Sequence, residues 1–102
     1  MKCKVAAVSR PQATSSVQVD NERVRVTEWR FAPGEATGLH RHEFDYVIVP
    51  VLGGTLRLES SETSAEAELV AGRSYFREAG IEHDVVNAGD AELAFVEVEL
   101  KG

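Results

Sequence analysis

Apolar residues alternate with polar ones over short stretches of the chain, and glycine, proline, serine, asparagine and aspartate separate these stretches. Alternating runs spaced about 8 to 12 residues apart are typical of the strands of a β-sandwich or β-barrel. A helical period is not sustained over enough residues to predict a helix of any length. The pattern therefore predicts an all-β fold of roughly eight to ten strands.

The first predicted element is a hairpin, because residues 17–20 and 23–26 both alternate and a turn-forming Asp-Asn pair begins the connection between them. Beyond Thr27 the apolar residues move from even positions to the odd positions of Trp29 and Phe31. A shift of this kind is expected where a β-bulge or a corner between two sheets bends the strand. We therefore expect an irregularity near Thr27.

The segment 46–52, YVIVPVL, is almost continuously apolar, which is typical of a strand that is buried on both faces. Something is then expected to cover its outer side. Pro50 has no N–H to donate to a sheet ladder, so this strand should have an edge or a bulge there. Further strands are predicted at 55–59, 65–69, 73–77, 82–87 and 93–100.

Glutamates alternate with apolar residues in two of these predicted strands. Glu66 and Glu68 do so in one, and Glu97 and Glu99 alternate with valine and leucine in the last. Because half-buried strands usually turn their polar side chains to solvent, all four are interpreted as a solvated sheet face without a chemical role.

Length and charge limit the classes of protein to consider. A chain of 102 residues is expected to form one domain over residues 1–102. Its net charge of −6 disfavours nucleic acid and membrane surfaces as partners. It has neither the ~20 apolar residues of a membrane span nor the apolar core of a signal peptide, which predicts a cytoplasmic protein. The single cysteine, Cys3, cannot close an intrachain disulfide and is interpreted as a small apolar residue near a strand start.

The three histidines are the candidate chemistry. His40 and His42 are one residue apart, so a strand would point both rings to the same face, as a chelating pair requires. His83 shares a face of its predicted strand with Val85 and Asn87. Neutral imidazole is the commonest metal-binding side chain, yet a His-x-His pair alone fits exposed histidines as well.

The residues around these histidines resemble two motifs of the cupin family. The segment GEATGLHRHEFDYVIVPVLG is similar to the first cupin motif, G(x)5HxH(x)3-4E(x)6G, and matches it at Gly34, His40, His42 and Gly53. The segment GRSYFREAGIEHDVVN is similar to the second, G(x)5PxG(x)2H(x)3N, and matches it at Gly72, Gly80, His83 and Asn87. Glu78 replaces the proline of the second motif, which is expected to alter only a turn.

The resemblance implies a single cupin double-stranded β-helix, or jelly-roll, barrel with a divalent metal ion held by His40, His42 and His83. The residues of the first motif resemble those of small cupins described as β-alanine degradation proteins. The family resemblance also implies a homodimer. Asn87 is expected to tie down a loop through bonds from its side chain to the backbone rather than to contact a substrate.

One departure from the family bears on the chemistry. The glutamate that usually serves as the fourth metal ligand corresponds here to Tyr46. In a straight strand from His40, the side chains of Arg41, Glu43 and Asp45 would face away from the histidines. A phenol with an ordinary pKa of ~10 is expected to donate hydrogen bonds beside the metal rather than to bind it as an anion. Tyr46 is therefore the candidate catalytic residue.

Three neutral imidazoles would leave the ion its full double positive charge and open coordination positions. A small carboxylate or keto-acid metabolite is then the expected ligand. An iron, zinc, nickel or manganese ion would fit, because imidazole ligands do not select among them. The hypotheses left open are a metal-dependent oxygenase, isomerase or lyase, a non-catalytic metal- or metabolite-binding cupin module, and a metal-free scaffold.

Overall fold

The computed structural model describes residues 10–102, and that part of the chain consists of strands and loops. None of its segments forms a helix capable of crossing a membrane. Cys3 lies outside the described residues. The strands are β1 (Thr14–Asp20), β2 (Val24–Phe31), β3 (His40–Arg41), β4 (Asp45–Leu52), β5 (Gly54–Glu59), β6 (Ser64–Leu69), β7 (Tyr75–Arg77), β8 (Glu82–Asn87) and β9 (Leu93–Leu100). The predicted all-β fold is confirmed.

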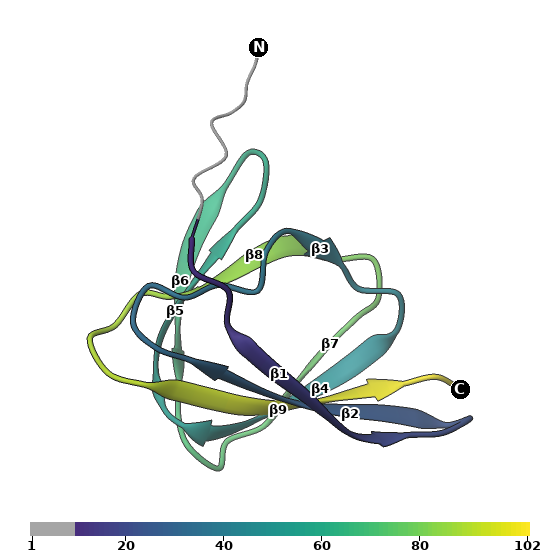
Figure 1. Cartoon of the computed structure of the whole chain (residues 1–102). Coiled ribbons are helices and arrows are strands. Elements are labelled where there is room, and N and C mark those ends of the chain that lie inside the picture. The colour runs from purple at the N-terminus through teal and green to yellow at the C-terminus, as the bar shows by residue number, and fades with distance from the viewer. Residues whose placement is uncertain (1–9) are drawn as a thin grey trace.

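The strands form two antiparallel sheets (Figure 1). One has five strands in the order β1-β2-β9-β4-β7, and the other has four in the order β3-β8-β5-β6. Neighbours such as β2 and β9, or β3 and β8, are far apart in the sequence, which is the interleaved arrangement of a jelly roll. The barrel therefore places residues from the two cupin-like segments next to each other.

The core fills one end of the barrel. Phe31 on β2 and Leu93 on β9 are directly opposite in register and are 0% exposed. The ring centroids of Phe31 and Phe95 are 5.5 Å apart. Ile48 from β4 and Leu56 from β5 join the same buried cluster, so both sheets contribute to it. Burial of a side chain of this size stabilises the fold by about 1.5–3 kcal/mol, so this cluster holds the two sheets together.

The predicted irregularity near Thr27 is wrong. β2 pairs with β9 without interruption over all eight residues from Val24 to Phe31, and the bulge lies instead in β1, between Val17 and Val19. The odd positions of β2 face inward along the whole strand. The inward residues change from polar to apolar along the strand, which produces the apparent phase shift in the sequence.

Strand β4 agrees with its prediction in part. Its pairing with β9 shifts register between Pro50 and Leu52, so the bulge expected at the proline is confirmed. Burial on both faces is wrong within the described residues of one chain, since Val47 and Val49 on the outer face are half-buried and Leu52 is exposed. The homodimer that would cover this face stays a prediction.

The role expected for Asn87 at the end of β8 is confirmed. Its side-chain amide donates to the carbonyl oxygens of Phe31 at 3.1 Å and Ala91 at 2.9 Å, and its oxygen accepts the Gly89 N–H at 2.9 Å. The residue is 2% exposed. It therefore ties the loop after β8 to the end of β2.

Candidate metal centre

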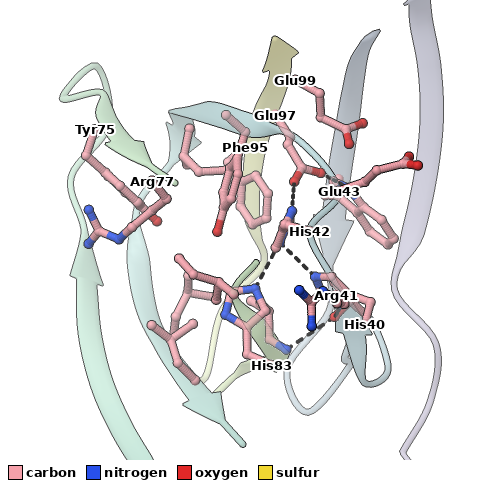
Figure 2. Close-up of a pocket in the computed structure, with 18 of the residues that line it drawn as sticks. His40, Arg41, His42, Glu43, Tyr75, Arg77, His83, Phe95, Glu97 and Glu99 are labelled. Atoms are coloured by element: carbon pink, nitrogen blue, oxygen red, sulfur yellow. Dashed lines mark hydrogen bonds and ion pairs between the residues drawn. The ribbon is translucent and has the colours of Figure 1, made fainter. Parts of the chain in front are cut away.

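The three histidine rings converge inside the barrel (Figure 2). His40 on β3 lies directly opposite His83 on β8, and His42 follows β3. The Nε2 atom of His42 is 3.0 Å from Nε2 of His40 and 3.1 Å from Nε2 of His83. The structure thus brings together the three residues that the sequence selected as candidate ligands.

Backbone contacts hold this arrangement in place. The His42 N–H donates to the Ile81 carbonyl, and the Gly80 N–H donates to the His42 carbonyl, both at 2.8 Å. His42 is thereby fixed to the loop before β8. Gly38 adopts φ 88°, a left-handed conformation that favours glycine, and its carbonyl lies 2.8 Å from Nδ1 of His40. Both halves of the site are therefore held by main-chain geometry.

The hydrogen bonds define which ring nitrogens carry protons. A carbonyl oxygen only accepts, so Nδ1 of His40 must donate to Gly38, and in a neutral ring the lone pair is then on Nε2. In His42, Nδ1 faces Oε2 of Glu97 at 3.3 Å, which leaves the Nε2 lone pair pointing toward His40. Two lone pairs 3.0 Å apart repel each other unless a cation lies near both. The donor set therefore fits a metal ion.

The protonation states of His42 and His83 also suit metal binding. Burial, together with smaller effects of the neighbouring His40 and His83 rings, lowers the pKa of His42 to about 4. Burial likewise lowers the pKa of His83 to about 4, with a smaller effect from His40. His42 and His83 are consequently neutral at physiological pH, as metal ligation requires.

Tyr46 lies beside this cluster at the start of β4. Its ring stacks on that of His42, with centroids 3.9 Å apart and planes inclined by 18°. Burial raises the pKa of Tyr46 well above its ordinary value, and the nearby Glu97 carboxylate acts in the same direction. The phenol therefore stays protonated at neutral pH and is a hydrogen-bond donor in the cavity wall.

Glu97 and Glu99 are not on a solvated face, and the prediction for these two residues is wrong. They are 8% and 9% exposed and point into the barrel from β9. Glu97 accepts a hydrogen bond from Trp29 Nε1 at 3.2 Å in addition to its contact with His42. Burial raises the pKa of Glu97 to about 7, helped by the charge of Glu99. Glu66 and Glu68, by contrast, are exposed as expected.

Glu99 is paired with a cation. The Arg25 guanidinium holds it through Nε at 2.7 Å and Nη2 at 3.2 Å. Cross-strand register places these two residues opposite each other on β2 and β9, and both line the cavity. The guanidinium of Arg25 is thus occupied by Glu99.

The prediction that Arg41, Glu43 and Asp45 face away from the histidines is also wrong in part. β3 ends at Arg41 in the four-stranded sheet and β4 begins at Asp45 in the five-stranded sheet, so no straight strand connects them. The exposed side chains of Arg41 and Glu43 line the cavity as a result. Asp45 does face elsewhere, where its carboxylate accepts the Ala79 N–H at 2.8 Å.

The histidines open into a cavity of about 470 Å³. The imidazoles, Tyr46 and Glu97 form its polar part, and Ile48, Leu56 and Phe95 form part of an apolar wall. A space of this size accommodates a small organic molecule next to the three Nε2 atoms.

Comparison with known proteins agrees with the motifs. The family model described as Cupin domain matches residues 27–99. The β-alanine degradation protein BauB of Pseudomonas aeruginosa is 61% identical over 92 residues, which cover 90% of this chain and 97% of that protein. The crystal structure of a cupin domain from Bordetella pertussis Tohama I has 53% identity and a TM-score of 0.88, with 94% of this chain and 100% of that chain covered. A Klebsiella pneumoniae protein with a double-stranded β-helix domain has 20% identity, a TM-score of 0.74, and coverage of 94% and 83%, and shows the fold alone.

Proposed function

Because this chain belongs to the cupin domain family, we propose that it binds a divalent metal ion at His40, His42 and His83 and acts there on a small carboxylate or keto-acid metabolite. The observation that carries this proposal is the convergence of the histidine Nε2 atoms at 3.0–3.1 Å, with the opposite ring nitrogens of His40 and His42 facing acceptors. Neutral histidines oriented in this way favour a metal site over a metal-free scaffold.

The charge of the ligand set supports an anionic substrate. The position of the usual cupin carboxylate is occupied by Tyr46, so the three ligands are neutral. A divalent ion bound there would supply Lewis acidity or, if it is iron, reactivity toward oxygen. Since no protein carboxylate would occupy a position on the ion, an anionic group of the substrate is the complementary ligand.

Residues of the chain would bind and orient that substrate. The protonated phenol of Tyr46 can donate to a carboxylate or enolate oxygen. The apolar wall formed by Ile48, Leu56 and Phe95 keeps the other side of the cavity dry, which strengthens polar contacts made inside it. The name of the 61% identical relative supports a role in β-alanine degradation, since β-alanine carries a carboxylate.

Elemental analysis of protein purified without a metal-affinity tag tests the proposal. We expect about one equivalent of iron, zinc, nickel or manganese per chain, as one set of three ligands would hold. Protein that contains no metal, and takes up none on addition of Fe²⁺ or Zn²⁺, would contradict the proposal.

The second candidate function is a non-catalytic binding module, which the neutral ligand set also allows because it can hold an anion without transforming it. Turnover distinguishes the two. Oxygen uptake on addition of a diketone or thiol acid to the iron-containing protein would support an oxygenase. Stoichiometric carboxylate binding without turnover would support the binding module.

Replacement of Tyr46 by phenylalanine is expected to leave the metal content unchanged and to weaken carboxylate binding about tenfold, as expected for loss of one hydrogen bond to a charged acceptor. The phenylalanine ring preserves the stacking on His42. Calorimetric titration of the metal-loaded protein with malonate measures the effect. Tyr75→Phe is the matched control, because Tyr75 also lines the cavity but its ring packs under Arg77. Equal losses in the two variants would assign Tyr46 no particular role.

A further inference from the structure

We propose that Glu97 is the positioning residue of the metal centre. It holds His42 in the tautomer that presents Nε2 to the ion, and its carboxylate lies next to a ligand set in which Tyr46 stands at the position of the family's glutamate. This inference rests on the proposed metal site. It assigns a function to a residue that lies outside both cupin-like segments.

The position of Glu97 is fixed from two sides. Its Oε1 accepts from the indole N–H of Trp29 at 3.2 Å. Its Oε2 faces Nδ1 of His42 at 3.3 Å (Figure 2). Residue 97 lies on β9, whose neighbours in the sheet are β2 and β4. With both carboxylate oxygens engaged on a central strand, the acceptor for His42 is held rigidly.

The geometry also defines what Glu97 does not do. Its carboxylate addresses Nδ1 of His42, whereas the atom that converges with the other two histidines is Nε2. Glu97 therefore acts through the imidazole ring and is not itself a fourth ligand. A carboxylate on the far nitrogen keeps the proton on Nδ1 and makes Nε2 a stronger donor to a metal.

Among the described residues, no lysine or arginine side chain forms an ion pair with Glu97. Its two polar side-chain contacts are with the indole N–H of Trp29 and with Nδ1 of His42. The guanidinium of Arg25 forms a two-point ion pair with Glu99. A cation at the three Nε2 atoms would compensate the buried carboxylate through the His42 ring.

The test uses the full chain and Zn²⁺, with affinity measured in competition with a chelating dye. We expect Glu97→Gln to weaken zinc binding about 10- to 100-fold and Glu97→Asp to restore part of the loss. Glu99→Gln is the matched control, because it removes a buried carboxylate from the same face of β9 that contacts Arg25 instead of a histidine. This control is expected to change zinc affinity no more than about threefold, since the Glu99 charge is already paired.

A second readout separates positioning from a general structural role. Long-range proton–nitrogen NMR correlations of the imidazole rings should show the proton of His42 on Nδ1 in the wild type, and on Nε2 in a fraction of Glu97→Leu molecules. Zinc affinity equal to wild type in Glu97→Gln would overturn the inference, as would an unchanged His42 tautomer in Glu97→Leu. Failure of the wild type to bind zinc would instead overturn the proposed metal site.

Discussion

Replacement of His83 by alanine is expected to lower the metal content of the purified protein from about one equivalent to nearly none, and to weaken zinc binding about a hundredfold or more. His83 is the one candidate ligand contributed by β8, and its Nε2 atom lies 3.1 Å from that of His42. Its loss leaves a two-histidine site that must be completed by water. The measurement is elemental analysis together with chelator competition.

Glu82→Ala is the control for this prediction, because Glu82 precedes His83 on the same strand and its exposed side chain points to the opposite face. It should bind zinc as the wild type does. Thermal unfolding of both variants establishes that the barrel is intact, and His40→Ala, at the shorter strand β3, provides a second way to remove a ligand. Unchanged metal content in both histidine variants would support the metal-free scaffold.

The positions of strands could be predicted because alternation and turn residues are local signals. The predicted segments 82–87 and 93–100 coincide with β8 and β9. The pairing of His40 with His83 is a non-local feature, and it followed from the resemblance to two cupin motifs rather than from periodicity. Local pattern therefore predicted the elements, and family resemblance predicted which of them meet.

The inward face of β9 could not be assigned from alternation alone. Period two separates two faces but does not say which one is interior, and the usual assumption places the glutamates outside. This barrel contains a polar cavity at one end, so Glu97 and Glu99 face inward on the same side as Leu93 and Phe95. The shared odd parity of these four residues was the available signal.

The partner strand carries the same signal. In register, Thr27 on β2 lies opposite Glu97, and Phe31 lies opposite Leu93. Both strands thus change from polar to apolar inward residues at the same level of the barrel. A bulge explains such a shift in one strand alone, whereas a shift at the same level in two paired strands indicates the boundary between a cavity and a core.

Counting alternate residues from His40 to Tyr46 also failed to predict which side chains face the cavity, for a different reason. Alternation applies only along a continuous strand, and β3 comprises two residues before the chain crosses to the other sheet. Arg41 and Glu43 consequently line the cavity, whereas in a straight strand their side chains would point away from it. The matches that survive, the inward position of Tyr46 and the outward position of Asp45, reflect the start of a new strand rather than an unbroken count from His40.

The substitution Asn87→Ala is expected to lower the free energy of unfolding by about 3 kcal/mol, which corresponds to a fall in melting temperature of ~10–20 °C for a domain of this size. The change leaves the carbonyl oxygens of Phe31 and Ala91 and the N–H of Gly89 without their present partners. Asn87 is 2% exposed, so water has little access to replace these bonds. Chemical denaturation of the metal-free protein measures the loss without a contribution from the metal.

Asn21→Ala is the matched control, because Asn21 also binds backbone from a turn but does so in solvent. Its side-chain oxygen accepts the N–H groups of Arg23 at 2.8 Å and Val24 at 3.0 Å. Water can satisfy both donors after the substitution, so we expect a loss within about 1 kcal/mol. Comparable losses in the two variants would contradict the argument from burial. A large loss confined to Asn87→Ala would mean that the last residue of the second motif serves the fold, in contrast to the metal-binding role proposed for His83, four positions earlier.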